Sequence, residues 1–330
     1  MQHIFAAAIS TIVAGMLAAT VAYPVTASGQ SSSTKLPKLI KIVVPFAPGA
    51  STDIFARLLG QKLAVRNEST VTVENRGGAS GVIGAEYVSR AAADGSTLMV
   101  HSTPFTASPA VQPKLPFDPV KGFAPIAMLA RGPLFFVIAD DLPYRSLAQL
   151  FDAARANKGR FNYGSTGIGS SHHLNTALLN SMAGSEMTHV PYKGGGLAVT
   201  DLIVGRIQVM LFSYSTVMPH VKSGKIRALA VSSQSRSRFA PDLPTISETV
   251  PGFSVNAWWG VFAPGATPQP IVNHLNAEIR AIVSLPEMRA AFEKEGVDSV
   301  SMTADEFTAF VRSDLDKWRN VARKLKIVVE

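Results

Sequence analysis

Short apolar runs alternate with helical patterns along most of this chain, and this alternation is the feature that most limits its fold. Each run has the length of a buried strand, and the stretch after it has apolar residues at helical spacing. The alternation favours parallel strand–helix–strand units of an α/β protein over a β-sandwich or a helical bundle. We expect strands near 39–46, 71–75, 97–102, 134–139, 161–165, 187–192, 207–213 and 227–232, and helices near 52–64, 81–91, 146–157, 170–183 and 196–205.

The pattern changes after about residue 268, where only helices are predicted. These helices cover Ile271 to Leu285, Glu287 to Lys294 and Ala304 to Leu325. Two strand-like segments, Phe123 to Ala130 and Trp258 to Pro264, are flanked by Pro and Gly and lie far apart in the sequence. We expect them to form a hinge of two crossing strands, where the chain passes to a second domain and returns.

The first expected strand runs through a Pro/Gly turn directly into a helix start. The first N–H groups of a helix have no intrahelical partner and lie at the positive end of its dipole, so a small anion is their natural ligand. The alternative is an ordinary connection in which Ser51, Thr52 and Asp53 only cap their own helix. The candidate binding residues of this turn are Phe46, Ala47, Gly49, Ala50, Ser51, Thr52 and Asp53.

Comparable turns follow later strands. Glycines allow a close approach of the backbone to a ligand, and hydroxyl groups add hydrogen-bond donors. A dinucleotide site is disfavoured, because Gly167 and Gly169 begin a G-x-G-x-x-G-like run whose third glycine position is occupied by His172. Lys193 is either a charge offered to an anion or a solvent-facing lysine. The candidate ligand-binding residues of these later turns are Ser102, Thr103, Ser165, Thr166, Gly167, Ser170 and Lys193.

The N-terminal segment is typical of an export signal. Residues 1–27 contain no Lys, Arg, Asp or Glu, and an apolar run from Ile4 to Ala22 is followed by small residues up to Ala27. We expect cleavage near Ala27 and a periplasmic product, with an uncleaved membrane anchor as the alternative. The chain has no cysteine, which excludes disulfides, thiolate metal sites and cysteine nucleophiles.

The formal net charge of +8 belongs to the expected mature protein, because the signal segment contributes no charged side chain. The basic residues are concentrated only on the C-terminal helix, at Lys317, Arg319, Arg323, Lys324 and Lys326, where they lie beside Asp314 and Asp316. This favours a solvated helix face over a nucleic-acid surface. We therefore expect no nucleic-acid partner.

Enzymatic and metal sites find little support in the sequence. No G-x-S-x-G motif is present, and acidic residues beside the glycine turns are single. His172 and His173 are adjacent, which directs them to different faces of a helix, and no H-x-x-x-H occurs. We expect no catalytic residues, no metal and no cofactor.

Together, these turns resemble the Bug family of extracytoplasmic solute receptors, the TctC-like binding components of tripartite tricarboxylate transporters. The resemblance covers nearly the whole expected mature chain. It is carried by Val43–Asp53, Val73–Arg76, Ala93–Gly95, Lys114–Lys121, Phe123–Ile126, Tyr163–Gly167, His189–Gly194 and Arg227–Val231.

This resemblance implies a two-domain flytrap of the periplasmic binding protein type II kind, with a C-terminal helical wrap, that closes on a carboxylate held by backbone amides and water. The implied domains are residues 36–130 with 256–330, and residues 131–255. In the first domain, Ala47, Ala50, Ser51 and Thr52 match the carboxylate-holding turn. In the second domain, Ser165, Thr166, Gly167 and Ser170 match the opposing turn.

Three positions depart from the family pattern: Ala50 replaces a frequent glycine, Gly77 a usual proline, and Phe212 with Ser213 a frequent acidic residue. The missing acid disfavours a ligand ammonium group and favours a plain di- or tricarboxylate or an aromatic carboxylate. We expect a monomeric receptor that delivers its ligand to membrane permease subunits. A receptor docking on a sensor-kinase ectodomain is the chief alternative, and an exported hydrolase is a weaker one.

Overall fold

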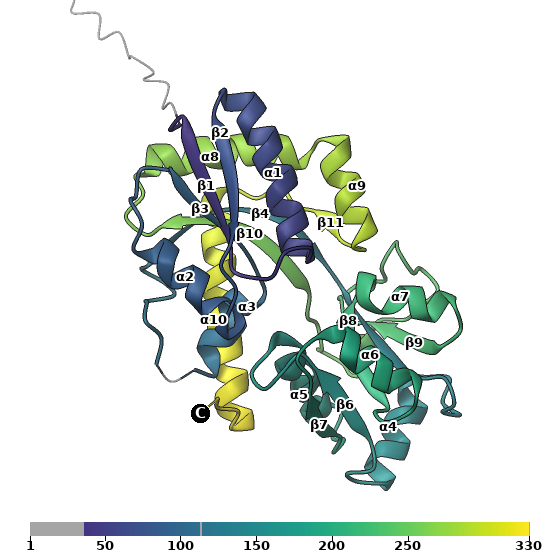
Figure 1. Ribbon diagram of the computed structural model, residues 1–330. Coiled ribbons are helices and arrows are strands. Elements are labelled where there is room, and N and C mark those ends of the chain that lie inside the picture. The colour runs from purple at the N-terminus through teal and green to yellow at the C-terminus, as the bar shows by residue number, and fades with distance from the viewer. Residues whose placement is uncertain (1–35, 113, 330) are drawn as a thin grey trace, which may run out of the picture. The chain divides into compact units, whose positions relative to one another are not determined.

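The computed structural model describes residues 36–112 and 114–329, all of which fall in one compact unit (Figure 1). The expected export signal, residues 1–27, lies outside the described residues. The described chain forms two β-sheets, each with helices on both faces. Each sheet with its helices is called a lobe below.

The sheet of the first lobe has the order β11-β4-β10-β3-β1-β2. β1 pairs in parallel with β2 and β3, whereas β10 is antiparallel to β3 and β4, and β11 is antiparallel to β4. One core cluster joins one face to α1, α8 and α9, and another joins the opposite face to α2 and α10. The strands are β1 (Leu39–Val44), β2 (Thr70–Asn75), β3 (Thr97–Ser102), β4 (Phe123–Gly132), β10 (Ala257–Pro264) and β11 (Asp298–Ser299). The helices are α1 (Ser51–Asn67), α2 (Val82–Ser89), α3 (Pro104–Ala107), α8 (Gln269–Val283), α9 (Pro286–Lys294) and α10 (Ala304–Leu325).

The sheet of the second lobe has the order β7-β6-β8-β5-β9. Its interior strand β5 is apolar at every position because it is covered on both faces. Leu134, Phe136 and Ile138 belong to the core under α4 and α5, and the alternate residues Phe135 and Val137 belong to the core under α6 and α7. The strands are β5 (Leu134–Ala139), β6 (Asn162–Ser165), β7 (Thr188–Pro191), β8 (Val209–Ser213) and β9 (Ile226–Val231). The helices are α4 (Leu147–Ala156), α5 (Ser171–Met182), α6 (Gly195–Ile203) and α7 (Tyr214–Lys222).

Two features differ from the expectation of parallel units followed by helices alone. β4, β5 and β10 run antiparallel to neighbours, because the chain enters and leaves the second lobe through adjacent strands. The short elements α3, α7 and β11 were not predicted. In α7, Pro219 inside the helix and several hydroxyl residues conceal the helical pattern, and β11 is too short to have a period.

The crossing between lobes confirms the predicted hinge strands. β4 and β10 pair antiparallel from Phe123 with Pro264 to Gly132 with Ala257. Just beyond them, the fully buried Ser232 ties the two crossing segments together. Its hydroxyl accepts a hydrogen bond from the Leu134 amide at 2.7 Å and donates one to the Val255 carbonyl oxygen at 2.8 Å.

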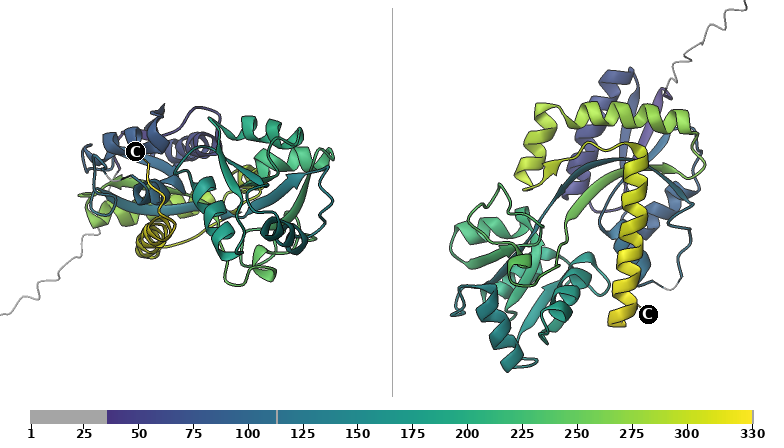
Figure 2. Two further views of the ribbon diagram at one scale, coloured as in Figure 1. Left: turned by 90° about the horizontal axis from the view of Figure 1, so that it is seen from below. Right: turned by 180° about the vertical axis from the view of Figure 1, so that it is seen from behind.

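Helix α10 packs on the cores of both lobes (Figure 2). It begins with a capping box of Thr303 and Glu306. In its first half Phe307 packs under the first sheet, and in its second half Trp318 packs in the core of the second lobe. Lys317, expected on the solvated face, instead donates a hydrogen bond to the Ser254 carbonyl oxygen at 3.0 Å, and burial lowers the pKa of its ammonium group.

The packing of α10 on β10 yields a test of the fold. A methyl group at Gly260 would collide with the Phe307 ring, so Gly260→Ala should lower the free energy of unfolding by about 1–3 kcal/mol. Gly196→Ala is the matched control, because no atom lies within 4 Å of the added carbon in α6. We expect urea unfolding to show no loss of stability in the control. Equal stability of the two variants would contradict the packing.

Candidate functional site

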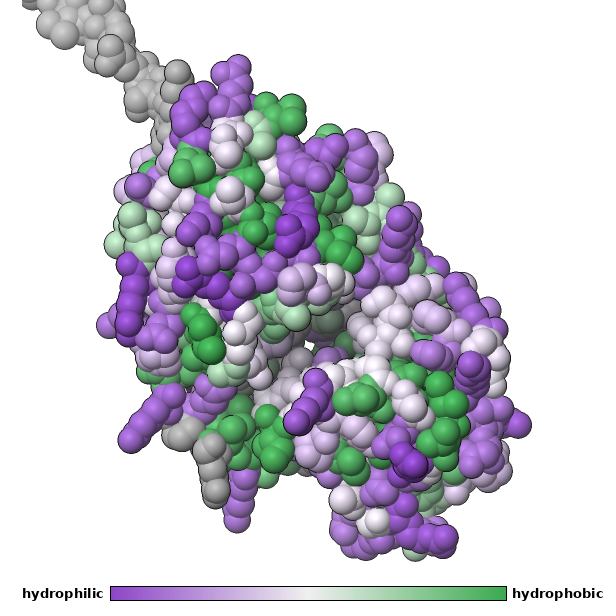
Figure 3. All heavy atoms as spheres, viewed as in Figure 1, coloured by the Kyte–Doolittle hydropathy of each residue, from purple (hydrophilic) through white to green (hydrophobic). Residues whose placement is uncertain are grey.

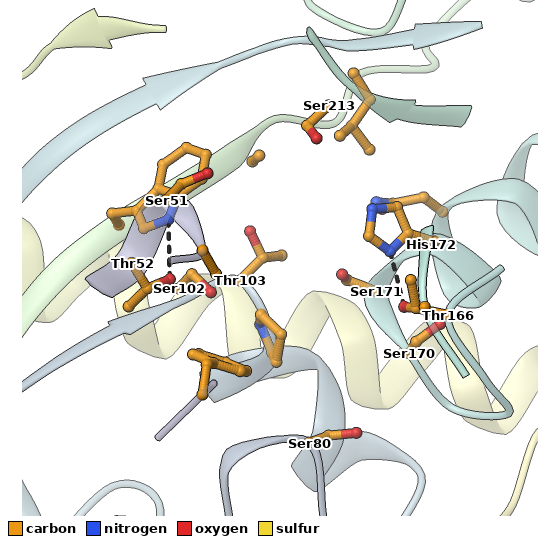
Figure 4. Close-up of a pocket in the computed structure, with 18 of the residues that line it drawn as sticks. Ser51, Thr52, Ser80, Ser102, Thr103, Thr166, Ser170, Ser171, His172 and Ser213 are labelled. Carbon is orange, nitrogen blue, oxygen red and sulfur yellow. Dashed lines mark hydrogen bonds between the residues drawn. The ribbon is translucent and has the colours of Figure 1, made fainter. Parts of the chain in front are cut away.

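A cleft of about 500 Å³ lies where strands of both sheets end (Figure 3). β1, β3, β6 and β8 all direct their carboxyl ends toward it, which is where α/β proteins bind ligands. Figure 4 shows hydroxyl side chains of the two lobes facing this space. The lining residues are Phe46, Ala47, Ala50, Ser51, Thr52, Ser80, Ser102, Thr103, Pro104, Leu134, Thr166, Ser170, Ser171, His172, Asn175, Gly194, Ser213, Ala257 and Trp259.

Within the described chain, four helices of nine or more residues begin at this cleft. α1 and α5 start at lining residues Ser51 and Ser171, and α6 and α7 start directly after lining residues Gly194 and Ser213. The unpaired N–H groups and dipoles of these helix starts place partial positive charge around the cleft. Among the described residues, no Asp, Glu, Lys or Arg lines it. The site therefore attracts an anion through its backbone.

Many of the sequence-predicted binding residues are brought together in this lining. They come from the turn after β1, from the end of β3 and from the turn after β6. The predicted residues that line the cleft are Phe46, Ala47, Ala50, Ser51, Thr52, Ser102, Thr103, Thr166 and Ser170.

Gly49 and Asp53 lie outside the lining and shape the first turn. Gly49 has a φ of +84°, and its amide donates to the Asp53 carboxylate at 2.9 Å. That carboxylate also accepts hydrogen bonds from Arg57 and Asn75. Burial alone would raise the pKa of Asp53, but the hydrogen bonds from Arg57, Gly49 and Asn75 lower it below its usual value. Asp53 is thus an ionised support of the turn.

Ser165, Gly167 and Lys193 also lie outside the lining. Lys193 is exposed to solvent. Ser165 is fully buried and lies 2.6 Å from His189 Nε2, a spacing like that of a nucleophile and its base. Its hydroxyl also contacts the amide and the carbonyl oxygen of Gly167, each at 3.0 Å. All three contacts are satisfied when the Ser165 oxygen accepts from His189 Nε2 and from the Gly167 amide, while the Ser165 hydroxyl donates to the Gly167 carbonyl oxygen. This arrangement holds the turn together.

Several cleft hydroxyls are already engaged. Ser51 donates to the Glu295 carboxylate at 2.7 Å, so its oxygen rather than its proton is available to the cleft. Thr52 accepts from the Trp259 indole at 3.2 Å and so orients that ring, as Figure 4 shows. Arg76 pairs with the Glu74 carboxylate, stacks on the Tyr87 ring and does not line the cleft.

His172 is the most informative residue that the sequence did not assign to the site. Its ring stacks on Phe212, with centroids 4.0 Å apart, and its Nδ1 lies 3.1 Å from the Thr166 hydroxyl. Burial lowers the pKa of His172 to about 4, so the imidazole is neutral at pH 7. The cleft therefore remains uncharged at its second-lobe wall.

The remaining lining residues were not among the predicted binding residues, although Ser213 was singled out as a position that affects the choice of ligand. Ser171 and Asn175 lie one turn apart on α5, a spacing that could have marked them as a pair. Leu134 and Ala257 come from the crossing segments, and the sequence carries no signal that they meet there. The other unpredicted lining residues are Ser80, Pro104 and Gly194.

Within residues 36–112 and 114–329, no cluster of three or more His, Asp or Glu side chains is arranged to hold a metal ion. In the same part of the chain, no helix combines the length and apolar character that crossing a bilayer requires.

Comparisons with known proteins agree with the fold. Residues 55–327 match the model of the tripartite tricarboxylate transporter family receptor. BugT of Bordetella pertussis is 33% identical over 297 residues, which cover 89% of this chain and 91% of that protein.

Two solved structures are similar over nearly their whole length. The structure of R. palustris Rpa4515 with adipate matches with a TM-score of 0.78 and 32% identity. The match covers 88% of this chain and 98% of the Rpa4515 chain. MatC from Rhodopseudomonas palustris with bound malate has a TM-score of 0.75 and 31% identity, and covers 86% of this chain and 98% of that one. These matches confirm the predicted α/β, two-domain binding-protein fold.

The buried imidazoles predict how stability depends on pH. Burial lowers the pKa of His101 to about 3 and those of His172 and His189 to about 4. Below about pH 6.5 the unfolded chain binds protons at these residues that the folded chain does not, so stability should fall as the pH drops. The contribution of His101 alone is about 2 kcal/mol between pH 6.5 and 5. In urea unfolding, the free energy of unfolding should fall less steeply with decreasing pH in His101→Gln than in wild type. Identical pH dependence in the two proteins would refute this assignment.

Proposed function

Because this chain belongs to the Bug family of extracytoplasmic solute receptors, the TctC-like receptors of tripartite tricarboxylate transporters, we propose that it captures a small organic carboxylate in its cleft. The observation that carries the proposal is the convergence of four helix starts on a cleft that no described charged side chain lines. A carboxylate held there gains charge-assisted hydrogen bonds without a counter-ion that must first be desolvated.

The composition of the wall supports a carboxylate over an amino acid. An ammonium group would need an acidic partner, and the second-lobe position where the family often has one is held by Phe212 and Ser213. Phe46, Leu134 and Trp259 offer apolar surface to the carbon skeleton. The proposed ligands are therefore di- or tricarboxylates or aromatic carboxylates.

The proposed physiological role is delivery of this ligand, in the periplasm, to the permease subunits of a tripartite tricarboxylate transporter. The two-domain fold supports such a role, because closure of the lobes converts ligand binding into a changed outer surface. We propose the domain division 36–130 with 256–330, and 131–255, and a receptor without catalytic activity. The buried position of the Ser165 hydroxyl supports the last point, since a substrate in the cleft cannot reach it.

The proposal predicts binding and closure together. Protein freed of copurified ligand by unfolding and refolding should show a raised melting temperature with at least one member of a carboxylate panel. The same ligand should lower the radius of gyration in X-ray scattering and slow hydrogen exchange at 123–132 and 256–264. A panel that spans aliphatic and aromatic mono-, di- and tricarboxylates without any binder would refute the proposal. Tight binding that leaves the radius of gyration and the hydrogen exchange of both segments unchanged would refute closure of the lobes.

The backbone of the first turn predicts a ranking of variants. Gly49→Val should weaken carboxylate binding strongly: space for a side chain is open, but valine does not tolerate the φ of +84° and would deform the turn. Ser51→Ala should cost at most about 0.5–1.5 kcal/mol, because the Ser51 proton is donated to Glu295. Calorimetry on variants with wild-type melting temperatures tests this. The opposite ranking would mean that recognition depends on the serine hydroxyl.

A further inference from the structure

One polar side chain of the cleft is buried without a hydrogen-bond partner. Asn175 is 2% exposed and lines the cleft from α5, and its Oδ1 atom has no partner within the described residues. A buried carboxamide left unpaired destabilises a protein, because its hydration is lost without compensation. Apolar side chains of similar volume would fit a buried helix position without this cost. A polar residue at position 175 therefore does not stabilise the ligand-free protein, and its role is to be sought in ligand binding.

Asn175 lines the cleft further along α5 than the helix start does. Ser171, four residues earlier on α5, lies on the same helix face and lines the cleft at the helix start. Asn175 lies four residues further, about 6 Å along the helix from the amides expected to hold a carboxylate. A ligand whose carboxylate lies at these amides can bring a second group to Asn175. The carboxamide can offer either its oxygen or its nitrogen by turning about its terminal torsion.

We propose that Asn175 determines specificity by hydrogen bonding to a second polar group of the ligand, beyond the carboxylate bound at the helix starts. This inference rests on the proposed carboxylate-binding function and narrows it. The ligand class is a carboxylate with a hydroxyl or a second carboxyl group a few bonds away. Plain monocarboxylates leave Asn175 unpaired and bind more weakly. An ammonium group is a poorer partner, because the described lining contains no acidic side chain.

Two series of probes test the assignment by calorimetry on refolded protein. One series is butyrate, 3-hydroxybutyrate and succinate, and the other is benzoate, 4-hydroxybenzoate and terephthalate. In at least one series, the members with a second polar group should bind wild type about tenfold more tightly than the plain acid. Asn175→Leu should remove this difference while leaving the affinity for the plain acid within about twofold of wild type.

Asn175→Asp separates the two kinds of second group. An aspartate still accepts a hydrogen bond from a hydroxyl, but it repels a carboxylate. Retained affinity for the hydroxy acid with lost affinity for the diacid identifies a hydroxyl-accepting Asn175. Loss of both identifies a carboxamide that donates to the ligand.

Asn276 provides the matched control. It is also buried, but its carboxamide donates to the carbonyl oxygens of Ile126 and Met302, at 2.7 and 3.0 Å, away from the cleft. Asn276→Leu should lower the melting temperature of the empty protein, whereas Asn175→Leu should leave it unchanged or raise it. A lowered melting temperature in Asn175→Leu, or an unchanged preference among the probes, overturns the inference while leaving the proposed function intact. Failure of every carboxylate to bind overturns both.

Discussion

The antiparallel pairing of β4 with β10 is the interaction on which the rest of this structure depends. Both strands belong to the first sheet, yet one carries the chain into the second lobe and the other brings it back. Ser232 then joins the two crossing segments at a fully buried point, so the entry and the exit are held beside each other. Because of this double crossing, the strand ends of one sheet face those of the other, and a cleft forms with Leu134 and Ala257 beside the crossing. Helix α10, which packs on both cores, completes this connection.

The electrostatics of the cleft depend on the backbone because the charged side chains nearby are occupied. Asp53 is paired with Arg57 behind the first turn, and Arg76 with Glu74. The Ser51 hydroxyl is donated to Glu295, and His172 is neutral as a result of burial. The groups that still face the cleft are the N–H groups of the helix starts and a set of hydroxyl groups. Such a site is suited to holding an anion by fixed dipoles, and under our proposal the discrimination among anions falls to Asn175, whose buried Oδ1 atom has no partner among the described residues.

The sequence predicted the strands and most helices well, because each buried strand or helix has its own apolar period. It also singled out the turn after β1, most of which lines the cleft, since Gly49 lies close in sequence to the hydroxyl residues Ser51 and Thr52. It did not predict α7, whose interior proline hides the helix, or the antiparallel direction of β5, which depends on the crossing. The engagement of Ser51 by Glu295 joins residues 244 positions apart, and no local pattern contains it.

The sequence by itself determined the local elements, the glycine turns that open helices, and the family resemblance that the comparisons confirm. These features depend on neighbouring residues and on periodicity, so they can be predicted from the sequence. Only the tertiary structure decided which of the predicted polar residues face a ligand. Asp53, Ser165 and Thr166 look alike as turn residues, but the first two are consumed by buried hydrogen bonds and the third lines the cleft. The physical reason is that a polar group is available to a ligand only where folding places it at the cleft with hydrogen-bonding capacity left over, and that outcome is set by contacts between distant segments.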